Sequence, residues 1–342
     1  MRNRFLLGMA ALAVASSCGS QEPAASMPVV VYTSVDDVFA RPIAERFQRE
    51  TGIEVLLVPD TEETKGTGLV NRLIAEKDRP QADVFWSGDP VRAAILKSRG
   101  VSAPYRSPQS EGLPSQFSDS EGHWTGFSAR ARVLIYNRNL VSAEQEPRSV
   151  MDLLEERFKG KAVIADPLFG TTSMHAAALF AALGDAKARE FFEGFAANGG
   201  KILSSNGEVR RRVADGEFAV GITDTDDANV ARLDGKPVGI VYPDQDGLGI
   251  LVIPNCAVLI EGGPNSAGGR KFIDYLLLPA TEQALAESEA AQMPVRPGVP
   301  VPAAMTPLDR LKPMRVDYAV LGSLLERLSA GYLKDWVDRS AR

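Results

Sequence analysis

The 342-residue sequence has few of the residues on which several protein classes depend. It contains only two cysteines, so no disulfide framework can support the fold. No run reaches the roughly 18 apolar residues that a membrane-spanning helix needs. The formal net charge of -6 would repel a polyphosphate, which argues against a nucleic-acid partner.

Catalytic signatures are scarce as well. A hydrolase of the Ser-His-Asp type needs a nucleophile, a base and an orienting acid, yet the chain has two histidines and no Gly-x-Ser-x-Gly motif. We therefore predict that the protein is not an enzyme. With 44% hydrophobic and 24% charged residues the composition is that of a globular protein, and the length suggests about two domains.

The N-terminus predicts export. Residues 1–4 are basic and residues 5–17 form a short apolar run before Cys18, which is the layout of a signal peptide at 1–17. Residues 14–18 resemble the lipobox of bacterial lipoproteins, although Ala15 stands where leucine is usual. Ordinary signal cleavage nearby remains the alternative.

We expect lipidation of Cys18 and a flexible tether at 18–27, which is small and polar. The lipid would then be the only attachment to a membrane, and the protein would be periplasmic or extracytoplasmic. Cys256 would have no cysteine partner, and its apolar surroundings predict an inert buried thiol.

From residue 28 onward, short apolar runs alternate with helical patterns, which favours an α/β fold with a mostly parallel sheet covered on both faces. A helix is expected from about residue 174, and another near the C-terminus that carries Leu321 and Trp336. The expected strands are 29–32, 53–58, 82–86, 132–137, 161–165, 201–203, 218–222, 238–242 and 249–260.

Several segments in this order resemble one known family. The chain is similar to the substrate-binding proteins of ABC transporters (extracellular solute-binding family 1), and within them most of all to the ferric-iron-binding group. The resemblance implies a two-lobed periplasmic-binding-protein fold of type II, with a ligand cleft between the lobes and a hinge of crossover strands. The segments that carry it are 29–34, 50–55, 81–86, 124–137 and 272–276.

The resemblance also implies discontinuous lobes. Lobe I would comprise 28–128 and 252–300, and lobe II 129–251 and 301–342. It further implies a monomer that hands a small ligand to the membrane permease of an ABC importer. Trp86 and Trp124 are expected near the cleft.

In such folds the ligand lies beyond the carboxyl ends of strands, so the loops there are candidate contacts. Ser34 and Asp36 follow the first strand, and Asp36 stands about where the ferric group has a histidine. Asp89 follows the third strand, one position away from the place where the family carries a carboxylate ligand. Helix capping is the alternative for both aspartates, and Pro90 after Asp89 favours it there.

A second set suits an anion. Gly170, Thr171 and Thr172 precede the expected helix at 174, where free N–H groups and the helix dipole favour negative charge, and the family holds a synergistic anion in a similar loop. Asn206 lies at the corresponding place before the next helix. Arg130 should project with Arg132 from one face of a strand, and a surface salt bridge is the alternative.

Thr223–Asp227 is the most unusual segment. The ferric group places adjacent tyrosines here, whereas this chain has no tyrosine pair. Asp224, Asp226 and Asp227 would repel one another unless they cap a helix, meet basic groups or bind a cation. With Asp36 and Asp89 they could form an oxygen-rich cluster that favours a hard cation.

Together with the resemblance, these oxygens lead us to expect ferric iron or another hard metal ion as the ligand, with or without a synergistic anion. Asp36, Asp226 and Asp227 are the candidate metal ligands, and no resident cofactor is expected. A small organic cation or a zwitterion, such as a polyamine, a thiamine-like compound or an aminophosphonate, is the alternative.

Overall fold

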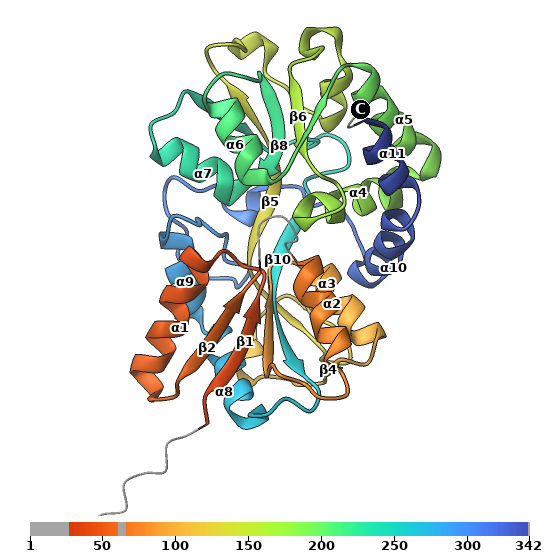
Figure 1. Ribbon diagram of the computed structural model, residues 1–342. Coiled ribbons are helices and arrows are strands. Elements are labelled where there is room, and N and C mark those ends of the chain that lie inside the picture. The colour runs from red at the N-terminus through yellow and green to blue at the C-terminus, as the bar shows by residue number, and fades with distance from the viewer. Residues whose placement is uncertain (1–26, 61–65, 341–342) are drawn as a thin grey trace, which may run out of the picture.

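The computed structural model describes residues 27–60 and 66–340. Figure 1 shows two α/β lobes, one above the other, with the strands β5 and β10 running from one to the other. The predicted signal peptide, Cys18 and all of the tether except Met27 lie outside the described residues. Within the described residues, no helix combines the length and the apolar character needed to cross a membrane.

The described residues form ten strands, eleven α-helices and six short 3-10 helices. The strands are β1 (Val29–Thr33), β2 (Val55–Pro59), β3 (Val84–Ser87), β4 (Ser102–Ala103), β5 (Thr125–Asn137), β6 (Ala162–Ala165), β7 (Lys201–Leu203), β8 (Val220–Asp224), β9 (Val238–Val241) and β10 (Val252–Ile260). The helices are α1 (Asp37–Thr51), α2 (Thr67–Ala75), α3 (Pro90–Ser98), α4 (Gly170–Leu183), α5 (Asp185–Ala197), α6 (Asn206–Ala214), α7 (Thr225–Leu233), α8 (Ser266–Leu276), α9 (Pro279–Glu287), α10 (Tyr318–Ser329) and α11 (Tyr332–Ser340).

The strand order explains the two lobes. It runs β2-β1-β3-β10-β5-β8-β6-β7, with β4 beside β10 and β9 beside β5. Strands β1, β2 and β3 are parallel in one lobe, and β6, β7 and β8 are parallel in the other. The crossover strands β5 and β10 pair antiparallel with each other and with their neighbours. The predicted parallel arrangement therefore holds within each lobe and ends at the crossover.

Strand β5 carries the chain between the lobes. Its first half pairs with β10 up to the Val252–Ala131 register, and its second half pairs with β8 from Arg132 opposite Asp224. Before this change of partner, within the β5–β10 pairing, the register shifts between Pro254 and Asn255 at Ser128, which has a φ of 36° in a fully buried position. The predicted lobe boundaries remain a prediction, but this register change falls next to the one proposed at 128 and 129.

Local signals fix the helix ends at the cleft. Helix α1 begins at Asp37, directly after Asp36 on the cleft, and stops at its far end where Gly52 adopts a φ of 71°, a left-handed conformation that glycine accepts without strain. Helix α3 begins with Pro90 after Asp89, whose side chain caps it as expected. These ends place the first turns of α1 and α3 directly after β1 and β3, at one edge of the sheet.

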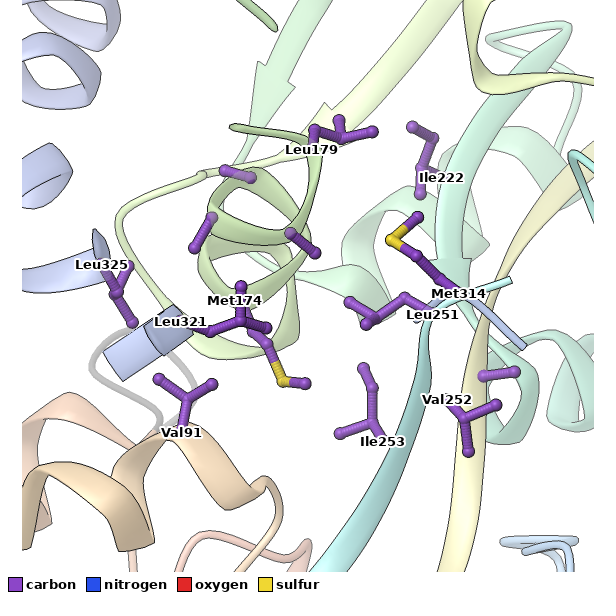
Figure 2. Close-up of a cluster of buried hydrophobic side chains, with 14 of the residues drawn as sticks. Val91, Met174, Leu179, Ile222, Leu251, Val252, Ile253, Met314, Leu321 and Leu325 are labelled. Carbon is purple, nitrogen blue, oxygen red and sulfur yellow. The ribbon is translucent and has the colours of Figure 1, made fainter. Parts of the chain in front are cut away.

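Apolar packing also joins the two lobes. Figure 2 shows Val91 of α3, Met174 of α4 and Leu321 of α10 in one buried cluster, close to residues of β10. Helix α10 packs against both α3 and α4, so the C-terminal segment contacts both lobes. Helix α11 packs on α5, where the Trp336 indole donates to the carbonyl of Phe192 at 3.0 Å.

Two helix predictions are corrected. Helix α4 begins at Gly170 rather than near 174, because its first turn is made of the small hydroxyl residues that the sequence reading assigned to a loop. The terminal helix is two helices, α10 and α11, separated at Ala330 and Gly331.

The expected position of the tryptophans is wrong. Trp86 is fully buried against Phe127 and Phe272, and Trp124 is buried against Tyr318. Both side chains pack into the apolar interior, and neither lines the cleft described below.

Candidate ligand-binding site

A cavity of about 430 Å³ lies between the lobes, where the N-termini of α1 and α3 face those of α4, α6 and α7. Six carboxylates and three guanidiniums line it, a formal excess of three negative charges. All eleven residues predicted from the sequence lie on its lining: Ser34, Asp36, Asp89, Arg130, Gly170, Thr171, Thr172, Asn206, Asp224, Asp226 and Asp227. The structure thus brings them together at one cleft, and their binding roles remain a proposal.

The α1/α3 wall consists of Ser34, Asp36, Gly88 and Asp89. The Ser34 hydroxyl accepts a hydrogen bond from the Gly88 N–H at 2.8 Å and so ties the ends of β1 and β3 together. Asp89 accepts from the Arg92 N–H at 3.0 Å, which is the capping role that the sequence left open. Asp36 precedes α1 but its side chain makes no capping hydrogen bond, so capping by this carboxylate is not seen.

The α4/α6/α7 wall consists of Gly170, Thr171, Thr172, Asn206, Asp224, Asp226 and Asp227. Its side chains are interlocked. The Thr171 hydroxyl donates to Asp224 at 2.6 Å, and the Asn206 amide donates to the Thr171 hydroxyl at 2.9 Å. Gly170 opens α4 with a φ of 54°, and Phe169 before it offers no side-chain cap. The polar side chains expected to hold an anion from solution are thus turned toward the carboxylate of Asp224.

The two arginines of β5 meet the same carboxylate. Arg132 Nη1 lies 2.7 Å and Arg130 Nε 3.3 Å from oxygens of Asp224, so both side chains do project from one face of the strand. Arg132 is 1% and Arg130 7% exposed. A surface salt bridge is therefore the wrong description, and these are buried ion pairs at the floor of the cleft.

Three carboxylates of this wall lie close together. One oxygen from each of Asp224, Asp226 and Asp227 falls within 4.8 Å of the other two. Burial raises the pKa of Asp226 to about 7; Arg130 opposes this rise, and the charges of Asp224 and Asp227 add to it. Burial also acts on Asp224, but the attraction of Arg132 and Arg130 outweighs it and lowers the pKa of that carboxyl below its ordinary value.

The five-carboxylate cluster predicted from the sequence is only partly formed. Asp36 and Asp89 line the same cavity but do not belong to the close group of three, because they lie on the opposite wall. Asp89 is held by its cap and by Arg92, whose Nη1 is 3.5 Å away. Asp36 remains a candidate ligand on the α1/α3 wall, across the cleft from the group of three.

The cleft is also lined by residues that we do not predict as site residues from the sequence: Val35, Phe39, Gly66, Gly88, Ala165, Asp166, Phe169, Ser204, Ser205, Gly207, Arg210, Arg211 and Gln292. Arg210 and Arg211 belong to a helix face that would ordinarily point to solvent, and a capping motif at its start was the only available signal. Gln292 follows α9 and reaches the cleft only through tertiary folding, so no local pattern marks it.

The two other side chains with reactive groups considered from the sequence, Cys256 and His175, lie outside the cleft. Cys256 is fully buried in β10, and burial raises the pKa of its thiol, which fits the inert role expected. His175 is buried in α4, where burial and then the charge of Arg132 lower its pKa to about 3. Neither side chain lines the cleft.

Residues 79–319 match the family model described as bacterial extracellular solute-binding protein. The chain belongs to this family. Its members bind a small ligand outside the cytoplasm and deliver it to an ABC permease; they are transport proteins rather than enzymes. Membership agrees with the two lobes, the crossover strands and the cleft between them.

The names of two relatives refer to different ligands. "Iron uptake protein A1" of Synechocystis is 26% identical over 327 residues, 91% of this chain and 89% of its own. A "putative 2-aminoethylphosphonate-binding periplasmic protein" of Salmonella typhimurium is 30% identical over 274 residues, 78% of this chain and 74% of its own.

Among solved structures, iron-bound HitA from Pseudomonas aeruginosa superposes with a TM-score of 0.81 at 23% identity. The match covers 90% of this chain and 99% of that one. At this identity the likeness establishes the two-lobed fold, and the ligand has to be argued from the cleft itself.

Proposed function

We propose that this protein is the solute-binding component of an ABC importer and that its cleft captures a hard metal cation, ferric iron or another, on carboxylate oxygens. The observation that carries the proposal is the group formed by Asp224, Asp226 and Asp227, whose oxygens lie within 4.8 Å of one another. Like charges held so close repel one another, and a cation between them removes the repulsion. Carboxylate oxygens are the donors that hard cations prefer.

The chemistry would differ from binding by phenolates. No tyrosine is among the residues described as lining the cleft, and Thr225, Asp226 and Asp227 stand about where the resemblance places the paired tyrosines. Asp226 and Asp227 would therefore be the main ligands. Asp36 would add a third carboxylate from the α1/α3 wall when hinge bending brings the walls together.

A zwitterion such as an aminophosphonate is the second candidate. Arg210 and Arg211 line the cleft beside the start of α4, which has no side-chain cap, so a phosphonate could bind there while Asp226 and Asp227 receive an ammonium group. The relative in Salmonella typhimurium named as an aminoethylphosphonate binder supports this alternative.

Titration calorimetry on ligand-stripped protein separates the two. Ferric citrate, Mn²⁺, Ca²⁺ and 2-aminoethylphosphonate would be titrated into wild type and into Asp226→Asn, Asp227→Asn and the control Asp37→Asn. Asp37 is the matched control because its carboxylate pairs only with the exposed Arg41 on α1 among the contacts described. We expect at least a tenfold loss of cation affinity in the first two variants and none in the control.

Two results would redirect the proposal. Equal cation affinity in wild type and in both cleft variants would overturn it. Tight binding of 2-aminoethylphosphonate that is lost in Arg210→Ala and Arg211→Ala would replace the metal with the zwitterion.

The cellular setting is proposed from the N-terminal sequence. Lipidated Cys18 would hold a monomer on the outer side of a membrane next to its permease, with residues 18–27 as a tether. We also infer that the cleft binds its ligand without transforming it, since its described lining contains no histidine or cysteine. Cys18→Ser should release the protein into the soluble fraction, and wild type that incorporates no labelled fatty acid would contradict lipid anchoring.

A further inference from the structure

Asp224 differs from its two carboxylate neighbours in what surrounds it. Its side chain is 4% exposed, and both oxygens accept hydrogen bonds from the protein. Oδ1 accepts from Arg132 Nη1 at 2.7 Å, while Oδ2 accepts from the Thr171 hydroxyl at 2.6 Å and from Arg130 Nε at 3.3 Å. A carboxylate has about four lone-pair sites, so most of the acceptor capacity of Asp224 is already used.

The donors around Asp224 form a shell drawn from three elements. Arg132 comes from β5, Thr171 from α4 and Asn206 from α6, and Asn206 Nδ2 lies 3.5 Å from Asp224 Oδ2. The shell is held together by its own contacts, since Arg132 Nη1 also donates to Thr171 and to Asn206 at 3.0 Å. Such a shell recognises a small oxyanion, because it presents a guanidinium, a hydroxyl and an amide to one point.

The shell holds more donor capacity than Asp224 satisfies. The buried Nε of Arg132 has no hydrogen-bond partner, although its side chain is only 1% exposed. Two guanidiniums, those of Arg130 and Arg132, face this one carboxylate. The shell is therefore electropositive, in contrast with the cleft as a whole.

The surroundings of Asp226 are different. The nearest guanidinium nitrogen is Arg130 Nε at 3.9 Å, and one of its oxygens accepts from the Asp227 N–H at 3.0 Å. Asp227 accepts from the Thr223 hydroxyl at 3.3 Å. Asp226 is thus not enclosed by guanidinium and hydroxyl donors in the way that Asp224 is.

We propose that Asp224 is an internal anion: its carboxylate occupies the oxyanion shell of Arg132, Thr171 and Asn206, where a phosphate or a carboxylate from solution would otherwise bind. The inference rests on the proposed function, because it assigns Asp224 to the protein's own charge balance and leaves Asp226 and Asp227 to the cargo. The cleft then loads its cation without a second anion from solution. The cleft should therefore prefer a free cation to a cation in a tight complex with an oxyanion, because the carboxylate of Asp224 already occupies the site that the oxyanion would need.

Removing the carboxylate should open the subsite. Inorganic phosphate would be titrated, with no metal present, into wild type, Asp224→Ala and the control Asp166→Ala. Asp166 is a matched control because it also lines the cleft, while the bond described for its carboxylate is to the Leu168 N–H at 2.8 Å rather than to a guanidinium. We expect phosphate to bind Asp224→Ala at least tenfold more tightly than wild type or Asp166→Ala, and acetate to bind the same variant.

If Asp224→Ala does not fold, Asp224→Asn tests the same point, with refolding yield compared in phosphate and in chloride buffer. A rise in yield or melting temperature with phosphate in the variant, and none in wild type, supports the proposal. Phosphate affinity in the variant equal to that of wild type overturns it.

A second arm uses wild type alone. Its affinity for Mn²⁺ should be the same in the presence and absence of phosphate, and a requirement for added phosphate would overturn the internal-anion role. If wild type binds no cation at all, the proposed cargo fails, but the phosphate titration still decides the role of Asp224 because it contains no metal.

Discussion

The two walls of the cleft present carboxylates in very different ways. On the α1/α3 wall, Asp89 is occupied by a helix cap and Asp36 stands apart from the close acidic group. On the α4/α6/α7 wall, Asp224 is enclosed by Arg130, Arg132 and Thr171, with two more carboxylates beside it. One wall is built from local capping and the other from a buried ionic network.

This contrast between a helix cap and a buried ionic network indicates where ligand binding and stability depend on the same residues. A cap is a local interaction, so a change on the α1/α3 wall should affect one helix end. A buried network depends on every member, because removing one charge leaves another uncompensated in a desolvated place. The α4/α6/α7 wall should therefore respond to substitution far more strongly than the α1/α3 wall.

The largest effect is expected for Asp224→Ala. Loss of this carboxylate leaves the buried guanidinium of Arg132 without its ion pair, which should lower the free energy of unfolding by roughly 3–5 kcal/mol. Urea denaturation in chloride buffer measures it. A loss below about 1 kcal/mol would show that the network does not hold this wall together.

The pH dependence of stability should come next, through His175. Its pKa is lowered to about 3 by burial and by Arg132, whereas the unfolded chain has the ordinary value of about 6.5. The unfolded state therefore binds the proton first, and stability that is present above pH 6.5 is lost as the pH falls toward 3. Between pH 7 and 4.5 this one group should remove about 2.5 kcal/mol.

The measurement compares wild type with His175→Gln by urea denaturation across that range. The variant should lose less stability on acidification, because glutamine takes up no proton. Parallel pH profiles for the two proteins would show that His175 is not buried as a neutral ring behind this wall.

A smaller effect is expected on the α1/α3 wall. Asp89→Ala should cost roughly 0.5–2 kcal/mol by removing the cap of α3, and Asp89→Asn should keep most of that stability because its amide oxygen can accept the same bond. Thermal unfolding of the two variants shows whether Asp89 stabilises the protein by capping α3 or through its negative charge. If asparagine is as destabilising as alanine, Asp89 acts through its charge on Arg92, and the contrast between the walls is weaker than described.

The smallest effect is expected just outside the cleft. Asp37 and Arg41 form an exposed i,i+4 pair on α1 at 2.6 Å, and solvent screens the attraction between these two charges. Asp37→Asn should change the urea midpoint only slightly, and less still at high salt. A loss as large as that of Asp89→Ala would mean that exposed charge, rather than capping, controls the start of the α1/α3 wall.

Much of this cleft follows from the sequence because parallel strands deliver their following loops to one edge of a sheet. Ser34, Asp89 and Asn206 lie just beyond a strand, Asp224 is the last residue of β8, and Thr171 lies in the first turn of the helix after β6, so this rule alone gathers them. The helix caps were also readable, since Pro90 after Asp89 is a strong local signal.

What the sequence did not reveal depends on long-range packing. The capture of Thr171 by Asp224 joins residues 53 positions apart, and no local pattern shows that Arg132 is buried between them. Thr171 and Thr172 have hydroxyl side chains that favour caps and turns, so the sequence predicts a loop where the structure has the first turn of α4. The position of Trp86 in a strand can be predicted from the sequence, but the face of the strand on which its side chain packs depends on long-range contacts.

The central claim is that a hard cation binds on the carboxylates of the α4/α6/α7 wall. Anomalous diffraction from crystals of ligand-stripped protein soaked in Mn²⁺ tests it most directly. We expect one strong peak roughly 2.0–2.6 Å from oxygens of both Asp226 and Asp227. A peak bound elsewhere, or an empty cleft at a Mn²⁺ concentration that saturates the protein in solution, would contradict it.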